Sequence, residues 1–220
     1  MGAPRGEELY IVGAGGHARE LHSYLQDLRH AGWDGKLRGC LDDHVPPGTY
    51  GRLEVLGTME SLPMTPGATS YYLTAVGSNA IRRKLVERLT ALHGSALRPW
   101  ALRHPLAAIG EDVEIGPGTC LAPGVIVTAQ TRIGSHCILN VKASVSHDCS
   151  IGDFANINPG ATVCGTVTVG EGAYIGAGAV VKEKISIGAW STVGAGAVVV
   201  RDVPPNVTVA GVPALILRQS

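Results

Sequence analysis

The stretch VSHDCSIGDFANINPGATVCGTVTVGEGAYIGAGAVV, residues 145–181, carries an aliphatic side chain at every sixth position. The spacing continues on both sides of this stretch without interruption. Its sixteen members are Ile109, Ile115, Leu121, Val127, Ile133, Leu139, Val145, Ile151, Ile157, Val163, Val169, Ile175, Val181, Ile187, Val193 and Val199. A mostly small residue stands two positions before each member, and glycine most often follows it. An unbroken six-residue period with glycine punctuation predicts a β-helix, in which short parallel strands stack and aliphatic side chains fill the axis.

Three hexads per coil, as in the left-handed form that this motif resembles, place residues 18 apart above one another. One such column consists of Ala129, His147, Gly165 and Glu183. We therefore expect His147 to stand over a residue without a side chain, beside an exposed backbone N–H. A second column consists of Ala122, Asn140, Asn158 and Gly176. It places a polar amide one corner away from the histidine.

The first half of the chain has a different sequence pattern, without the six-residue period. Apolar and amphipathic segments alternate there, which predicts strands at 9–12, 37–43 and 70–76 and helices at 18–28 and 80–92. This βαβ alternation indicates a small Rossmann-like parallel sheet, whose ligands bind at the carboxyl ends of its strands. We expect two domains: an α/β N-terminal domain over residues 1–103, and an all-β left-handed parallel β-helix over residues 104–220.

Composition narrows the class of protein. Lysine plus arginine equals aspartate plus glutamate at 18 each, so nothing favours an electrostatic grip on nucleic acid or on a membrane. The sequence shows neither a secretory signal nor an 18-residue apolar run, and we expect a cytoplasmic, soluble protein. The five cysteines form no CxxC pair and are interpreted as core packing. We expect no metal.

His147 and Asp148 are the candidate catalytic pair. Imidazole has the side-chain pKa closest to neutral, which suits it to take a proton from an attacking amine or hydroxyl. The adjacent carboxylate can orient the ring, as the acid of a hydrolase triad does. Two structural alternatives stay open: a solvated surface histidine, and an aspartate that serves only a turn.

The segment GAGGHA, residues 13–18, follows a predicted strand and precedes a predicted helix. Its G-x-G-x-x-A spacing fits a phosphate bound at the amino terminus of a helix. Taken alone, it equally fits a dinucleotide domain in which Asp42 or Asp43 binds a ribose hydroxyl. A redox module is weakened by the small size of this half and by the absence of a role for the β-helix.

VSHDCSIGDF, INPGATVCGTVTVGEGAYIGAGAVV, VVVRDVPPNVTVAGVPA and IVGAGGHARE together resemble the bacterial sugar O- and N-acyltransferases of the sialic acid O-acetyltransferase type. Within them the chain is most similar to acetyl-CoA-dependent N-acetyltransferases of nucleotide-linked 4-amino-sugars from bacillosamine and perosamine pathways. The resemblance implies a homotrimer with active sites between subunits. It also implies that His147 is the general base, that Asp148 assists it, and that the Gly165 amide lies near the thioester carbonyl.

The resemblance further implies contacts to the cofactor acetyl-CoA. They are assigned to Asn140, Asn156, Gly165, Ala177, Gly194, Ala195 and Arg218. Asn156 stands where the bacillosamine-type enzymes have a second histidine, so its contact is altered. The family's frequent GVPAK ending reads GVPAL here, which removes a lysine at Leu215 that could meet a CoA phosphate. Arg218 is the proposed substitute.

For the first half, the resemblance implies a site for the nucleotide-sugar. Its contacts are assigned to Gly13, Ala14, Gly15, His17, Asp42, Asp43 and Asn79. The glycine turn should lie near the phosphates and sugar, and the two aspartates near the base or ribose. Arg82 could line the same cleft, although a solvated helix face is the favoured interpretation.

Three functional hypotheses remain from the sequence. The first is N-acetylation of a nucleotide-linked amino-sugar, with a UDP, GDP or dTDP carrier. The second is O-acetylation of sialic acid or a polysaccharide on the same scaffold. The third is a non-catalytic β-helix or a nucleotide-binding redox module, which would release no thiol from acetyl-CoA with any sugar.

Overall fold

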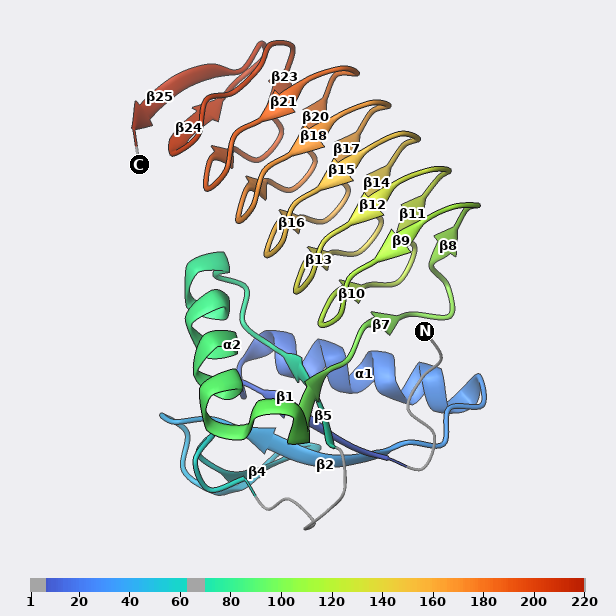
Figure 1. The fold of residues 1–220 in the computed structure, drawn as a ribbon, viewed down its shortest axis with the longest axis vertical. Coiled ribbons are helices and arrows are strands. Elements are labelled where there is room, and N and C mark those ends of the chain that lie inside the picture. Colours follow the sequence, from blue (N-terminus) through green and yellow to red (C-terminus); the bar gives the residue numbers. More distant parts are fainter. Residues whose placement is uncertain (1–6, 63–69, 220) are drawn as a thin grey trace. The chain divides into compact units, whose positions relative to one another are not determined.

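The computed structural model describes residues 7–62 and 70–219. The chain forms two compact units, which divide between Pro105 and Leu106 (Figure 1). Among the described residues, no helix is long and apolar enough to cross a membrane.

The first unit is a six-stranded sheet in the order β3-β4-β2-β1-β5-β6 with two long helices. Its elements are β1 (Glu8–Val12), α1 (Gly16–His30), β2 (Lys36–Leu41), β3 (Gly48–Tyr50), β4 (Leu53–Gly57), β5 (Ser70–Thr74), α2 (Asn79–His93), η1 (Gly94–Ala96), β6 (Leu97–Pro99) and β7 (Leu102–Arg103). The central strand β1 is almost completely buried and pairs in parallel with β2 and β5. A continuous apolar strand such as LYIV is typical of this central position.

The predicted βαβ order is confirmed, with four corrections. The strand predicted at 70–76 ends at Thr74. The strand predicted at 37–43 ends at Leu41, because Asp42 turns the chain by accepting the backbone N–H groups of His44 and Val45. The helix predicted from residue 18 begins at Gly16, so His17 belongs to its first turn. The sheet is not wholly parallel, since β3 and β4 form an antiparallel hairpin that the sequence reading missed.

The second unit is the predicted left-handed β-helix. Its sixteen two-residue strands, β8 to β23, each end at one aliphatic member of the hexad period. They are β8 (Ala108–Ile109), β9 (Glu114–Ile115), β10 (Cys120–Leu121), β11 (Ile126–Val127), β12 (Arg132–Ile133), β13 (Ile138–Leu139), β14 (Ser144–Val145), β15 (Ser150–Ile151), β16 (Asn156–Ile157), β17 (Thr162–Val163), β18 (Thr168–Val169), β19 (Tyr174–Ile175), β20 (Val180–Val181), β21 (Ser186–Ile187), β22 (Thr192–Val193) and β23 (Val198–Val199). Neighbours pair in parallel 18 residues apart, as in Val145 with Val163. From Leu121 onward every member of the period is buried, which gives the unit a continuous apolar axis.

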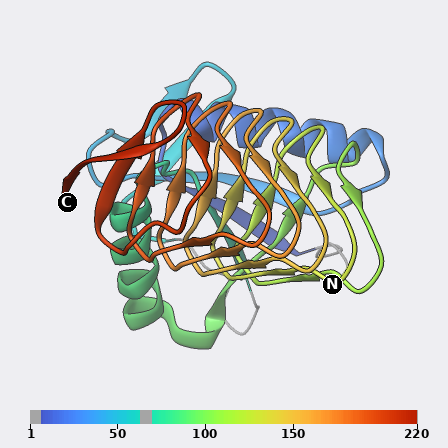
Figure 2. The ribbon, with the colours of Figure 1, turned by 90° about the horizontal axis from the view of Figure 1, so that it is seen from above.

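The strands form three faces, which we call face one, face two and face three (Figure 2). Face one contains β10, β13, β16, β19 and β22 and continues into the hairpin β24 (Val207–Ala210) and β25 (Leu215–Gln219). Face two contains β8, β11, β14, β17, β20 and β23, and face three contains β9, β12, β15, β18 and β21. The chain turns from one face to the next at corners that hold a residue with positive φ, glycine at many of them. At the corner between faces two and three these residues include Asp148, Thr166 and Lys184, with φ of 57°, 60° and 61°.

Candidate active site at the His147 corner

His147 lies on the corner between faces two and three, and we call this the His147 corner. Backbone hydrogen bonds hold successive coils in register there. The N–H of Asp148 donates to Ala129 O at 3.2 Å, that of Thr166 to His147 O at 2.9 Å, and that of Lys184 to Gly165 O at 3.1 Å. The ladder fixes the column that the 18-residue period predicted. It places the imidazole on the outer edge of the coil, where its side chain is 62% exposed in this single chain.

Asp148 holds the imidazole in one orientation. His147 Nδ1 lies 2.7 Å from Asp148 Oδ2. Because a carboxylate only accepts hydrogen bonds, Nδ1 carries the proton of a neutral ring and Nε2 keeps its lone pair. Asp148 also occupies the corner position with positive φ, which aspartate tolerates better than most residues. The same residue therefore occupies the turn and contacts the imidazole.

Gly165 provides the space beside the ring. A Cβ atom at this position would lie 2.6 Å from His147 Nε2 and 2.7 Å from Cε1, so only glycine leaves the imidazole where it is. The backbone N–H of Gly165 makes no hydrogen bond within the described part of the chain. A proton acceptor and an unused backbone donor thus stand on adjacent coils, as acyl transfer requires.

The two cysteines nearest this corner are part of the packing. Cys149 is 3% exposed, its Sγ lies 3.1 Å from Cys164 O, and burial raises the pKa of its thiol. A raised pKa keeps the neutral thiol at physiological pH, which is the poor nucleophile. All five cysteines are free, and four of them are buried. The geometry therefore favours direct transfer over a cysteinyl intermediate.

Most residues assigned to acetyl-CoA lie on a different corner of the same chain. Asn140, Ala177, Gly194 and Ala195 follow strands of face one, at the corner between faces one and two. We call this the Asn140 corner. There Asn140 Oδ1 accepts the backbone N–H of Val141 at 2.7 Å. A single β-helix does not bring these residues to His147, although it does bring Gly165 there.

Two further assignments lie elsewhere. Asn156 is on β16 of face one, where it is only 3% exposed in this chain. The backbone of Arg218 pairs with Thr208 in the terminal hairpin, whereas its side chain lies outside the described residues. Both cofactor contacts remain predictions. Among the described residues, no group of three or more His, Cys, Asp or Glu could hold a metal ion.

The first unit has its own pocket at the carboxyl ends of β1 and β2. Of the predicted substrate contacts, Gly13, Asp42 and Asp43 line it. The remaining lining comes from Val12, Leu41, His44, Met59, Val76, Ile81 and Leu85. Gly13 has a φ of +104°, and a Cβ there would approach Ala75 O to 3.2 Å. The apolar lining residues were missed by the sequence reading, because apolar side chains at strand ends and on the helix read as ordinary core.

Both aspartates have protein partners. Asp42 Oδ2 accepts the backbone N–H of Ala14 at 2.8 Å, which ties the glycine turn to the end of β2. Asp43 pairs with Arg88 at 2.5 Å, and Arg88 also pairs with Glu60. Asp42 therefore holds the glycine turn in place, whereas Asp43 forms an ion pair with the exposed Arg88.

The other predicted contacts surround the start of the helices. Gly15 is the N-cap of α1 and offers no side chain, so the first N–H groups of the helix have no side-chain cap. His17 Nδ1 lies 2.7 Å from Glu20 Oε2. Asn79 is 7% exposed at the start of α2. Arg82, expected on a solvated face, is fully buried and donates to Val76 O at 2.9 Å, so that expectation was wrong.

Both halves match known families. Residues 8–89 match the family described as PglD N-terminal domain, and residues 166–201 match the bacterial transferase hexapeptide family with six repeats. A GDP-perosamine N-acetyltransferase of Escherichia coli O157:H7 is 35% identical over 141 residues. That alignment covers 63% of this chain and 62% of the relative.

Two solved structures are similar over nearly the whole chain. The acetyltransferase domain of PglB from Neisseria gonorrhoeae FA1090 is 34% identical with a TM-score of 0.86, and the match covers 96% of this chain and 100% of that one. A mutant of perosamine N-acetyltransferase from Caulobacter crescentus, in complex with CoA and GDP-perosamine, is 32% identical with a TM-score of 0.85. Here 96% of this chain and 97% of that one are covered.

Proposed function

This chain belongs to the hexapeptide-repeat sugar acetyltransferases that carry a PglD-type N-terminal domain, and we propose that it transfers acetyl from acetyl-CoA to a nucleotide-linked amino-sugar. The observation that carries this proposal is the His147 ring, oriented by Asp148 and standing over the bare backbone of Gly165. Acetyl-CoA-bound PglB domain and CoA-bound perosamine N-acetyltransferase support the donor. The related GDP-perosamine N-acetyltransferase supports an amine as the acceptor.

The proposed chemistry is a direct transfer. The neutral amine attacks the thioester carbonyl carbon, and Nε2 of His147 accepts the proton that the nitrogen loses. The Gly165 N–H donates to the carbonyl oxygen as negative charge develops on it. The C–S bond then breaks, and CoA leaves as its thiol after taking a proton. Asp148 stabilises the imidazolium that exists between these two proton transfers.

Replacing His147 tests the proton acceptor. His147→Asn should lower kcat by about 10²-fold or more, the usual worth of a general base, while the affinity for acetyl-CoA is retained. Thiol release from acetyl-CoA, measured across UDP-, GDP- and dTDP-linked 4-amino-4,6-dideoxyhexoses, identifies the acceptor. Free sialic acid in the same screen tests a hydroxyl acceptor. Wild-type turnover in His147→Asn would rule out the proposed base.

We assign the nucleotide part of the acceptor to the first unit. Its pocket lies at the carboxyl ends of parallel strands, where α/β sheets bind ligands. The uncapped start of α1 leaves backbone N–H groups for a diphosphate, with Gly13, Ala14, Gly15 and His17 around it. Asp42, Asp43 and Asn79 are the proposed contacts beyond the turn. Equilibrium binding of UDP, GDP and dTDP to wild type and to Gly15→Asp, which introduces a repelling charge, tests this assignment.

We also propose a homotrimer, because the assigned residues lie on two corners of one chain. Face two separates the His147 corner from the Asn140 corner. Its outward side chains carry no charge: Ala108, Ile126, Ser144, Thr162, Val180 and Val198. Such a face suits contact with a second copy. A ring of heterologous contacts would bring the His147 corner of one subunit to the Asn140 corner of the next.

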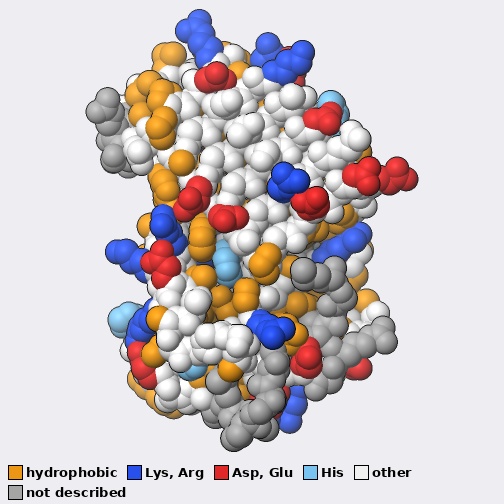
Figure 3. Space-filling view, in the orientation of Figure 1, with side chains coloured by type: hydrophobic (Ala, Val, Ile, Leu, Met, Phe, Trp, Pro, Cys, Tyr) orange, Lys and Arg blue, Asp and Glu red, His pale blue; other side chains and the backbone are white. Residues whose placement is uncertain are grey.

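Exposed apolar residues elsewhere on the second unit support an assembly. They gather in the terminal hairpin region, where Val212, Leu215, Ile216 and Leu217 are each at least 57% exposed (Figure 3). Contiguous apolar exposure of this kind marks interaction sites on proteins. The free cysteines fit a reducing compartment, and we propose that the enzyme works in the cytoplasm.

Complementation tests a shared site. His147→Asn inactivates one corner, and Ala177→Trp fills the other, since Ala177 is exposed. Each variant alone should be nearly inactive, whereas co-expressed variants should recover up to about a quarter of wild-type activity through interfaces that pair two intact corners. No recovery in hybrid trimers, or a monomeric mass by light scattering, would contradict the proposal.

A further inference from the structure

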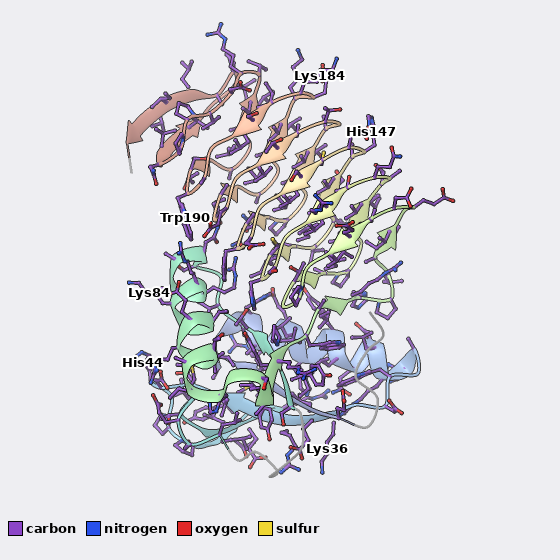
Figure 4. The ribbon with its side chains drawn as sticks, viewed as in Figure 1. Lys36, His44, Lys84, His147, Lys184 and Trp190 are labelled. Carbon is purple, nitrogen blue, oxygen red and sulfur yellow. The ribbon has the colours of Figure 1, made fainter. Side chains whose placement is uncertain are left out.

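Charge changes along the His147 corner. The positions that continue the column of His147 toward the C-terminus are Gly165 and Glu183, and those that continue the column of Asp148 are Thr166 and Lys184. Arg201 follows in the last coil, which is shorter than the others. The coil next to the histidine, at Gly165 and Thr166, is therefore uncharged on that side, and charged side chains begin two coils away. Figure 4 shows His147 and Lys184 on the same edge of the β-helix, and Figure 3 shows basic side chains around its last coils.

Two of the cations on this edge have no anionic partner within the described part of the chain. Lys182 is paired with Glu183 at 3.6 Å, but Lys184 and Arg201 are exposed and form no ion pair there. The acid next to them, Asp202, is occupied because its Oδ1 accepts the backbone N–H of Ser186 at 2.8 Å. By contrast, the exposed Arg132 on face three is paired with Glu114 at 2.8 Å.

The fold places Arg201 next to the Lys184 corner. The last coil is two residues shorter than the others, since Val203 bridges to Ile187 at a spacing of 16 rather than 18. The chain therefore passes Arg201 in a corner that is two residues shorter than the corner that holds Lys184. Lys184 itself sits at the positive-φ corner position, with φ of 61°, so its backbone is fixed while its side chain points outward.

We propose that Lys184 and Arg201 bind the phosphate groups of CoA, and that the donor lies along this edge with its thioester at Gly165. This assignment rests on the proposed acetyltransferase function. Strands in neighbouring coils lie about 4.8 Å apart, so Lys184 lies about 10 Å and Arg201 about 14 Å from the level of His147. The pantetheine arm spans the uncharged coil between them, and the anionic end of CoA meets two cations that have no anionic partner among the described residues.

Two acyl donors, one with and one without the phosphate groups of CoA, test the proposal. Lys184→Gln and Arg201→Gln remove the charges. Glutamine already occupies the corner position equivalent to Lys184 at Gln130, with φ of 54°, and Arg201 is exposed. Each variant should raise KM for acetyl-CoA by about 3- to 10-fold with kcat retained, because exposed charge-assisted contacts are of modest strength. KM for S-acetyl-pantetheine, which has no phosphate, should not change. Arg132→Gln is the matched control and should behave as wild type with both donors.

The outcomes separate this proposal from the proposed function. Unchanged KM for acetyl-CoA in both variants, or an equal rise for both donors, would overturn the phosphate contact while leaving the acetyltransferase intact. CoA binding by calorimetry needs no acceptor and gives the same comparison. If wild type binds CoA and the two variants weaken that binding, but no amino-sugar is acetylated, the contact stands and the proposed acceptor is wrong. No binding of CoA by wild type would overturn both.

Discussion

Substitution of Gly165 by alanine should separate activity from stability. The new Cβ would lie 2.6 Å from His147 Nε2, which is about 0.8 Å short of the 3.4 Å at which ordinary van der Waals contact begins. The backbone at Gly165 does not have the positive φ that would strain an alanine. The ring is 62% exposed, so it can move outward without displacing any buried side chain. The substitution therefore moves the imidazole and leaves the coil as it is.

The consequences for the two observables differ. Misplacing a catalytic group by about 1 Å can cost about 10²-fold in rate, so kcat of Gly165→Ala should fall by about that factor. The free energy of unfolding should stay within about 0.5 kcal/mol of wild type, as for other surface substitutions. Steady-state kinetics and urea denaturation of the same preparations measure both quantities.

A double-mutant cycle gives the decisive control. If Gly165→Ala acts by displacing the ring, it should cost nothing further in a His147→Ala background, because no ring remains to be displaced. If the two reductions in kcat multiply in the double mutant, Gly165 acts independently of the ring, for instance through its backbone N–H. Wild-type kcat in Gly165→Ala would refute the argument that the bare backbone positions the imidazole.

Three further predictions concern the groups around the two sites. Asp148→Asn keeps a residue that tolerates positive φ, so it should leave stability unchanged but lower kcat by about 10-fold, since the amide no longer stabilises the imidazolium; unchanged kcat would leave Asp148 a turn residue only. Gly13→Ala forces a Cβ at φ +104° toward Ala75 O and should destabilise the protein by about 1–2 kcal/mol in denaturant titrations, with weaker nucleotide binding; an unshifted midpoint would contradict the strain. Because burial raises the pKa of Cys149, iodoacetamide at about pH 7 should not reduce acetyl transfer, and a loss of activity that follows labelling of Cys149 by mass spectrometry would argue for a thiol intermediate.

Local pattern was enough to predict the β-helix because its interactions are local and repetitive. Each hexad supplies one buried aliphatic and one corner, and the coil above repeats the same arrangement 18 residues later. The stacking of His147 over Gly165 follows from this arithmetic alone. The βαβ order of the first half followed from periodicity in the same way, although the short antiparallel strand β3 was missed because its three residues, GTY, carry no periodic signal.

Other features depended on contacts between residues that are distant in sequence. The sequence assigned Asp42 to the substrate, and only the fold showed that its carboxylate also accepts the backbone N–H of Ala14, 28 residues away. The sequence placed Arg82 in solvent. In the fold its side chain is buried, and its guanidinium donates a hydrogen bond to Val76 O in the loop after β5.

The sequence by itself therefore determined the architecture and the pairing of His147 with Asp148, because periodicity and adjacency are properties of the chain. Only the tertiary structure showed which atoms the residues at each site contact. It showed that Asp42 holds Ala14, that Arg82 is buried, and that Val203 lies opposite Ile187 at a spacing of 16 residues in the last coil. The physical reason is that these contacts join residues far apart in sequence. The shortened last coil also departs from the 18-residue spacing, and a fixed period cannot predict such a departure.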